Sequence, residues 1–295
     1  MFTKIHFFFG LFMLAQISSA QTVLRYNLAE GDEFTIAQSA QQTITQEIPG
    51  RTQIIINDLK GVMNFKVTAV SEALITMEMH FKRFALKMSS PQLGVMMDID
   101  TDKKDNPEST ESLIFKGILN KSVYILMKPT GEITEVQQAE AIVNGMIESL
   151  GLEDAHAIEQ MKQELEKEWS ADGLAKSFEQ MTFNYPNTVI QKEGTWTNKF
   201  IGKGKIHAQN TWTLEEPSTD GNSIKGNAMI TMDLSNPQIE MLLEGSQQTT
   251  LKALANGFPK TMEVKTFASG DATIPGLPVQ TIPTQLESTT TYTLL

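Results

Sequence analysis

Apolar and polar side chains alternate along the segment LITMEMHFKRFALKM, residues 74–88. In an extended chain, one face of this segment would carry Ile75, Met77, Met79 and Phe81. The apolar phase then shifts, because Phe84 follows Phe81 by three residues rather than two. A β-bulge near Lys82 and Arg83 would return the later apolar residues to the same face. The pattern therefore predicts a half-buried antiparallel strand with one bulge.

The same two-residue period recurs in two long parts of the chain, residues 22–136 and 188–295. In the first part, VMNFKVTAV places Met63, Phe65, Val67 and Ala69 on one face. VYILMKPTGEITEV predicts two strands joined by a turn at residues 129–131. In the second part, KIHAQNTWTLEE, NAMITMDL and ESTTTYTLL alternate in the same way, whereas IPGLPVQTIP holds three prolines and predicts an irregular loop. Both parts are predicted to be β-rich.

Between these parts, residues 137–181 have the period of a helix. Ile158, Met161, Leu165 and Trp169 recur at spacings of three and four residues and form one apolar stripe. Shorter helices are predicted on either side of this one. Because a stripe of large side chains must be covered, we expect the helix to pack on the sheet of the same chain, with Trp169 as its anchor. The alternative is a mobile lid whose stripe faces a ligand cavity.

The order β, α, β along the chain favours an α+β fold. We expect mostly antiparallel, curved β-sheets in two β-rich parts, with a central helical insert that covers one face. Because the helices interrupt a strand-rich chain, residues 21–295 are expected to form a single compact domain rather than two independent ones.

The first twenty residues have the pattern of a cleaved export signal. Lys4 precedes a short apolar segment over residues 5–17, and Ser18-Ser19-Ala20 supplies the small residues that a signal peptidase reads. About 13 apolar residues are too few to span a hydrocarbon core, which needs about 20. The sequence therefore predicts a signal peptide over residues 1–20, cleavage after Ala20, and a periplasmic or extracellular protein with no later transmembrane segment.

Composition narrows the chemistry further. The chain has no cysteine, which excludes disulfides, zinc–thiolate sites and iron–sulfur clusters. A formal net charge of −11 disfavours nucleic acid and anionic membranes as partners. The motifs HExxH, GxSxG and the P-loop do not occur in the sequence. We therefore expect a non-enzymatic protein without a cofactor, and an enzyme remains a further alternative.

Four segments resemble a known family. They are YNLAEGDEFTIAQSAQQTITQEI, FKGILNKSVYILMKPTGEITEV, SFEQMTFNYPNTVIQKEGTW and ANGFPKTMEVKTFASGDA. The chain resembles an uncharacterised group of secreted bacterial proteins, mainly from Bacteroidota, that is described as a domain of unknown function. The resemblance implies export but supplies no catalytic residue.

Four aspartates gather in DIDTDKKD, residues 98–105. Asp98, Asp100 and Asp102 alternate as in the first half of a calcium-binding loop. The sixth position of such a loop requires glycine but is Lys103, and the twelfth requires glutamate but is serine. We interpret the segment as a polar loop between strands, followed by a short helix that begins at Asn106-Pro107. The three alternating aspartates remain candidate metal ligands.

Histidine and methionine are the other candidate ligands. His80, His156 and His207 lie far apart in the sequence, so we interpret them as surface residues. The 16 methionines fall mainly on apolar faces, where core packing is favoured over copper(I) binding. Their adaptable thioethers would also suit a pocket for an apolar ligand.

Two functions are compatible with this organisation. Curved sheets with apolar inner faces and a helical cover could enclose an apolar, lipid-like small molecule. The alternative is a structural or protein-interaction module of the cell envelope. In that case the Thr/Gln-rich strand SAQQTITQ, residues 39–46, would pair with a partner protein through an exposed strand edge.

Overall fold

The computed structural model describes residues 22–103, 110–202, 205–236, 239–275 and 281–295. The predicted signal peptide and the predicted helix start at Asn106-Pro107 lie outside these ranges, as do residues 276–280 of the proline-rich segment.

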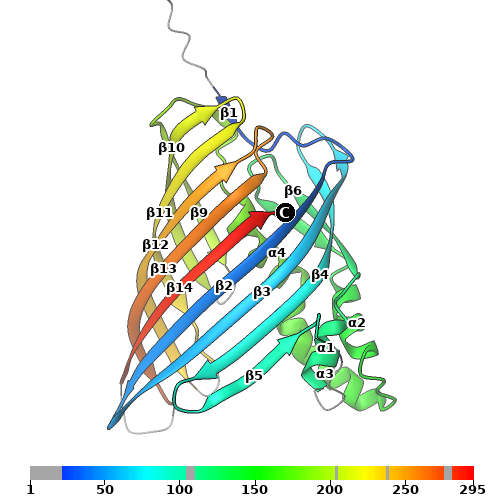
Figure 1. The fold of residues 1–295 in the computed structure, drawn as a ribbon, viewed down its shortest axis with the longest axis vertical. Helices are drawn as coiled ribbons and strands as arrows, with labels where there is room; N and C mark the ends of the chain where they lie inside the picture. The colour runs from blue at the N-terminus through cyan, green and yellow to red at the C-terminus, as the bar shows by residue number, and fades with distance from the viewer. Residues whose placement is uncertain (1–21, 104–109, 203–204, 237–238, 276–280) are drawn as a thin grey trace, which may run out of the picture.

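One large antiparallel sheet of 12 strands dominates the fold (Figure 1). Its strand order is β7-β6-β4-β3-β2-β14-β13-β12-β11-β10-β9, and β5 also pairs with β4. The first β-rich part contributes β2 (Glu33–Ile48), β3 (Arg51–Val70), β4 (Ile75–Ser90), β5 (Gly94–Asp100), β6 (Ser122–Met127) and β7 (Ile133–Gln137). The second contributes β9 (Thr195–Gly202), β10 (Ile206–Ser218), β11 (Gly221–Asp233), β12 (Glu240–Ala253), β13 (Pro259–Thr273) and β14 (Ile282–Leu294). Short strands β1 (Thr22–Leu24) and β8 (Thr188–Ile190) form a separate pair.

The two β-rich parts are continuous through the pairing of β2 with β14. Four helices accompany the sheet: α1 (Thr110–Lys116), α2 (Glu140–Glu148), α3 (Ala155–Trp169) and α4 (Ala171–Thr182). The last three form the predicted central insert. The predicted class, a mostly antiparallel curved β-sheet with a central helical insert, is therefore confirmed.

The predicted bulged strand over residues 74–88 is confirmed as β4. Its apolar face is buried, as predicted for Ile75, Met77, Met79 and Phe81. On the neighbouring strand β3, Val62 pairs with Arg83 and Met63 pairs with Phe81, which leaves Lys82 as the extra residue. The bulge restores Phe84 to the buried face.

One prediction on β3 is wrong. Ala69 was expected on the buried face with Val67, but it is exposed. The pairing of β3 with β4 shifts register between Val67 and Ala69, so the alternation of faces does not continue to the end of the strand.

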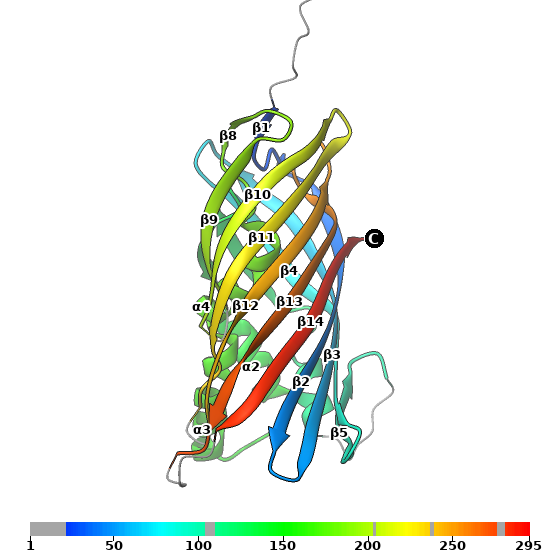
Figure 2. The ribbon, with the colours of Figure 1, turned by 90° about the vertical axis from the view of Figure 1, so that its left-hand side faces the viewer.

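The sheet curves around the helices, and α4 lies between its two edge strands (Figures 1 and 2). The backbone N–H of Ile133 in β7 donates to Glu179 Oε1 of α4 at 2.9 Å. On the opposite edge, Asn198 Nδ2 of β9 donates to the carbonyl oxygen of Phe183 at 2.7 Å. Helix α4 and the residues after it therefore protect both edges of the open sheet.

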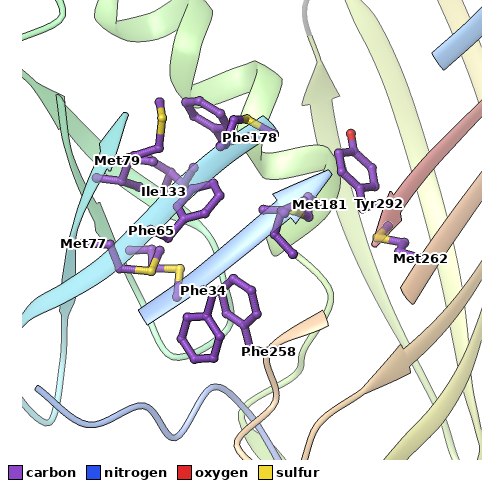
Figure 3. Close-up of a cluster of buried hydrophobic side chains, with 14 of the residues drawn as sticks. Phe34, Phe65, Met77, Met79, Ile133, Phe178, Met181, Phe258, Met262 and Tyr292 are labelled. Carbon is purple, nitrogen blue, oxygen red and sulfur yellow. The ribbon is translucent and has the colours of Figure 1, made fainter. Parts of the chain in front are cut away.

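The concave face of the sheet carries two apolar clusters. The main core joins strands to helices, and Figure 3 shows Phe178 and Met181 of α4 among side chains of the sheet. Within it, the rings of Phe34 and Phe258 stack with centroids 3.8 Å apart. The second cluster contains residues of β2 and β9–β14, together with residues that join β11 to β12. None of its described members belongs to a helix.

Candidate functional site

Helix α3 reaches the sheet through its last residue. The ring of Trp169 lies edge-on to Phe81 and Phe84 of β4 and to Phe115 of α1, with centroids 6.0, 6.1 and 6.1 Å away. Phe84 and Phe115 stack on each other at 4.7 Å. Trp169 is therefore the contact between the helical insert and β4, as its place in the apolar stripe predicted.

The helix is buried less deeply than the stripe suggested. All four stripe residues are only half-buried, and α3 has no fully buried residue. Apart from Trp169, the helix packs mainly on α2 and α4. The expectation that the whole stripe packs on the sheet is thus met only at the end of the helix.

Local capping explains why Trp169 ends the helix. Ser170 has an extended backbone, which stops α3, and its hydroxyl oxygen accepts a hydrogen bond from the N–H of Gly173 at 3.2 Å. Ser170 is therefore the N-cap of α4. The resulting break between the two helices places Trp169 at a bend above the sheet.

A cavity of about 410 Å³ lies behind Trp169, between the concave sheet face and helices α1, α3 and α4. The sheet contributes five apolar side chains: Leu59, Met63, Phe81, Phe84 and Leu86. The helices contribute five more: Phe115, Trp169, Leu174, Phe178 and Met181. At a water-like volume of about 30 Å³ per group, the space suits on the order of a dozen methylene-sized groups.

Few polar groups line this cavity. They include Gln38 of β2, Ser177 of α4 and Tyr292 of β14, together with Glu168 beside Trp169. The hydroxyl of Tyr292 donates to Gln180 Oε1 at 3.1 Å, and burial raises its pKa, so it stays neutral. Among the described residues, no lysine or arginine lines the cavity. The lining of the cavity is therefore mostly apolar.

The helical cover is attached to the sheet by a partly buried carboxyl group. Burial raises the pKa of Glu179 above its ordinary value, whereas the hydrogen bond from the N–H of Ile133 opposes that rise. Thr182 strengthens the same attachment, since its hydroxyl donates to the carbonyl oxygen of Gly131 at 2.7 Å. At the start of α3, the capping residue Asp154 accepts hydrogen bonds from within the helix: its side chain accepts from the N–H of Ala157 and its carbonyl oxygen accepts from the N–H of Ile158.

The candidate metal ligands Asp98, Asp100 and Asp102 lie at the end of β5, outside this cavity. Each carboxylate already faces a cation. Lys103 Nζ lies 2.9 Å from Asp98, and Arg83 lies 2.9 Å from Asp100 and 3.0 Å from Asp102. Although burial opposes ionisation, the hydrogen bond from Arg83 helps to lower the pKa of Asp100. The arrangement is that of a salt-bridged strand end.

The three histidines do not meet in space. His80 lies on β4 and is half-buried, and His207 is exposed on β10. His156, at the start of α3, lies with its Nε2 3.0 Å from Gln160 Nε2. Across the described ranges, no group of three or more His, Asp or Glu side chains is arranged to hold a metal ion.

The structure corrects one functional expectation. Residues 39–46 of β2 pair with β14 on one side and with β3 on the other, so this segment has no free edge for a partner strand. The sequence looked like a solvent-exposed edge because it is rich in polar residues, two of which, Gln42 and Gln46, lie on the inward face together with Ala40 and Ile44. Sequence reasoning expected an apolar space under the helices but did not identify most of the residues that line it, since its walls come from seven elements: β2, β3, β4, β14, α1, α3 and α4.

Comparison with known proteins identifies the family. Residues 72–258 match a family of unknown function, DUF6263. The chain belongs to the DUF6263 family. The expected resemblance to a domain of unknown function is thereby confirmed. No curated protein matches this DUF6263 chain significantly.

Comparison with solved structures gives distant matches for the DUF6263 chain, two of which are as follows. One is lipovitellin, in a structure that describes lipid–protein interactions, with 10% identity and a TM-score of 0.47. The alignment covers 90% of this chain but only 25% of the lipovitellin chain. The other is an outer membrane channel from Pseudomonas putida F1, with 7% identity, a TM-score of 0.26, and coverage of 92% and 98% of the two chains. Neither similarity is close enough to assign a function. Over the described residues, every helix is too short or too polar to span a bilayer.

Proposed function

We propose that this DUF6263 protein is a non-enzymatic binding protein that holds an apolar, lipid-like small molecule between its sheet and its helices. In this proposal, residues 1–20 are removed after Ala20, residues 21–295 act as one domain, and the protein works in the periplasm or outside the cell. The observation that supports it best is the cavity of about 410 Å³ behind Trp169.

The size and lining of the cavity support this proposal. Protein interiors are close-packed, and few of their voids exceed a water molecule. Ligand pockets, by contrast, are concave and mostly apolar, with volumes of about 300–1,000 Å³. The cavity here is in that range and is walled by ten large apolar side chains and a few polar ones. No residue of α3, which covers the cavity at Trp169, is fully buried.

Gly61 offers a direct test of the proposal. It lies on the cavity wall, and a Cβ at this position would meet its nearest atoms only at 3.9 Å. The variant Gly61→Leu should therefore fill the cavity without disturbing the strand. Lys60→Leu is a matched control, because it adds an apolar side chain at the adjacent, exposed position of the same strand.

The measurement is binding of a neutral fluorescent naphthylamine, with mass spectrometry of the natively extracted protein. We expect the parent and Lys60→Leu to bind the probe and to carry a co-purified apolar molecule, and Gly61→Leu to lose both. Equal probe binding by all three proteins, or no binding by the parent, would refute this proposal.

A second candidate is the protein-interaction module, and one observation favours it. The outer face of the second β-rich part exposes Ile201, Met229 and Phe267 to extents of 50%, 73% and 46%. Ile201 and Met229 line a surface hollow of about 380 Å³. Exposed apolar groups of this kind are typical of contact surfaces. A stoichiometric protein partner in an envelope extract, lost in Met229→Lys but retained by Gly61→Leu, would support this function instead.

A further inference from the structure

Strand register places neutral polar side chains in one row across the concave face of the sheet. Going from β10 through β14 to β2 and β3, the row contains Asn210, Gln247, Thr266, Ser288, Gln42 and Asn57. Ala228 of β11 is the single apolar interruption between them. The row carries amides and hydroxyls and has no charged member.

The row faces the interior of the protein. Side chains two residues apart share a face of a strand, and β2 pairs with both neighbours without a shift in register. Gln42 therefore lies on the same face as Gln38, which lines the cavity. Asn210, Gln247 and Thr266 are at most 8% exposed, whereas Gln42, Asn57 and Ser288 are half-buried.

Buried polar side chains of this kind lower the stability of a protein unless they form hydrogen bonds. Burying an amide or a hydroxyl without a hydrogen bond is unfavourable, because the group loses its hydrogen bonds to water. Some of the row is paired internally: Asn57 Nδ2 donates to Gln42 Oε1 at 3.0 Å, and Gln247 Nε2 donates to Thr266 Oγ1 at 3.1 Å. Asn57 Oδ1 is buried and accepts no hydrogen bond. The row therefore contains one buried hydrogen-bond acceptor, Asn57 Oδ1, that has no partner.

Asn57 lies near the cavity, although it is not part of the cavity wall. Asn57 precedes Leu59 by two residues on the same face of β3, and Leu59 is part of the cavity wall. At about 3.4 Å per residue, the two side chains start roughly 7 Å apart. Leu86, the partner of Leu59 on β4, lines the same end of the cavity. The polar row therefore lies one step along the strands beyond the cavity wall at Leu59.

We propose that the polar row next to Asn57 is a head-group subsite of this cavity, and that the ligand is an amphiphile with an uncharged hydrogen-bonding head. This inference rests on the proposed function. The apolar chain of the ligand lies in the cavity, and a hydroxyl or amide N–H of its head donates to Asn57 Oδ1. Gln42 and Ser288 follow Asn57 in the same row, on β2 and β14. Since the described lining of the cavity has no basic side chain, a free carboxylate would be buried there without a counter-charge.

The test compares two ligands with the same chain and different heads. Monododecanoylglycerol and dodecanoate are used to displace the neutral naphthylamine probe from the parent and from Asn57→Leu. The control is Gln53→Leu, which changes a polar residue on the same face of β3 but four positions farther from the cavity. Thermal melting confirms that all three proteins are folded.

We expect the parent to bind the glycerol ester at least about tenfold more tightly than dodecanoate at neutral pH, the difference that 1.4 kcal/mol would produce. Asn57→Leu should weaken binding of the glycerol ester by about tenfold and leave the affinity for the naphthylamine unchanged. Gln53→Leu should change neither affinity. Tighter binding of dodecanoate, or no effect of Asn57→Leu on the ester, would overturn the head-group subsite while leaving the apolar cavity intact. Failure of the probe itself to bind would overturn both the proposed function and this inference.

Discussion

Replacement of Trp169 by alanine is the most informative single change in this protein. A fully buried tryptophan costs about 3–5 kcal/mol when it is truncated to alanine. Trp169 is only half-buried, but its ring contacts three other aromatic rings at about 6 Å. Edge-to-face pairs add about 0.5–1.5 kcal/mol to burial. Taking about half of the burial value, we expect Trp169→Ala to lower the free energy of unfolding by about 2 kcal/mol.

Urea denaturation followed by circular dichroism measures this quantity directly. The corresponding fall in melting temperature is about 4–8 °C for a domain near this size. Trp169→Phe should recover most of the loss, because it keeps an aromatic ring at the same place. His156→Ala, an exposed position on the same helix, should stay within about 0.5 kcal/mol of the parent.

The same variant also tests whether Trp169 contributes to ligand binding in the cavity. Because Trp169 both contacts β4 and lines the cavity, Trp169→Ala should also reduce the increase in melting temperature that a bound ligand produces. A variant as stable as the parent would refute the packing of α3 on the sheet. A loss above about 4 kcal/mol would refute the half-buried position of the ring.

Three further predictions concern the attachment of the helices and the aspartates. Because the folded-state pKa of Glu179 is raised, its contribution to stability is present at low pH and is lost as the pH rises through that value. Between about pH 4 and pH 7, the free energy of unfolding measured by urea denaturation should therefore fall less in Glu179→Gln than in the parent. The same pH dependence of the free energy of unfolding in both proteins would contradict this. Gly131 has φ +88°, and a Cβ there would lie 1.7 Å from a carbonyl oxygen of α4, so Gly131→Ala should cost more than about 2 kcal/mol in thermal melting. The control Gly50→Ala, with φ +82° and open space around it, should cost only about 1 kcal/mol, and equal losses would exclude the clash. Calorimetric titration should detect no micromolar calcium binding, because the aspartates already pair with basic side chains, and a signal that Asp100→Ala abolishes would show the opposite.

The local patterns of the sequence predicted the elements well, because they depend on neighbours along the chain. The buried face of β4 follows from the alternation of Ile75, Met77, Met79 and Phe81, and the bulge at Lys82 follows from one shift of that phase. The stripe that ends in Trp169 similarly predicted a helix with one apolar side. Ala69 was misassigned, because a register shift depends on the partner strand as well as on the strand itself.

The candidate site could not be predicted in the same way. Its walls combine β2, β3, β4 and β14 with three helices, and they meet only because the sheet curves and α4 lies between its edges. The pairing of Gln42 with Ser288 joins residues that are 246 positions apart, so no local pattern could show the polar row that they share. The same Thr/Gln-rich strand was therefore interpreted from its sequence as an exposed edge.

The sequence by itself thus determined which segments are strands or helices and which side chains of each share a face. Only the tertiary structure decided which of those faces meet, and therefore which polar side chains are buried and where an apolar space remains. The physical reason is that periodicity arises from the geometry of a single strand or helix. Burial instead depends on register between distant strands and on the curvature of the whole sheet.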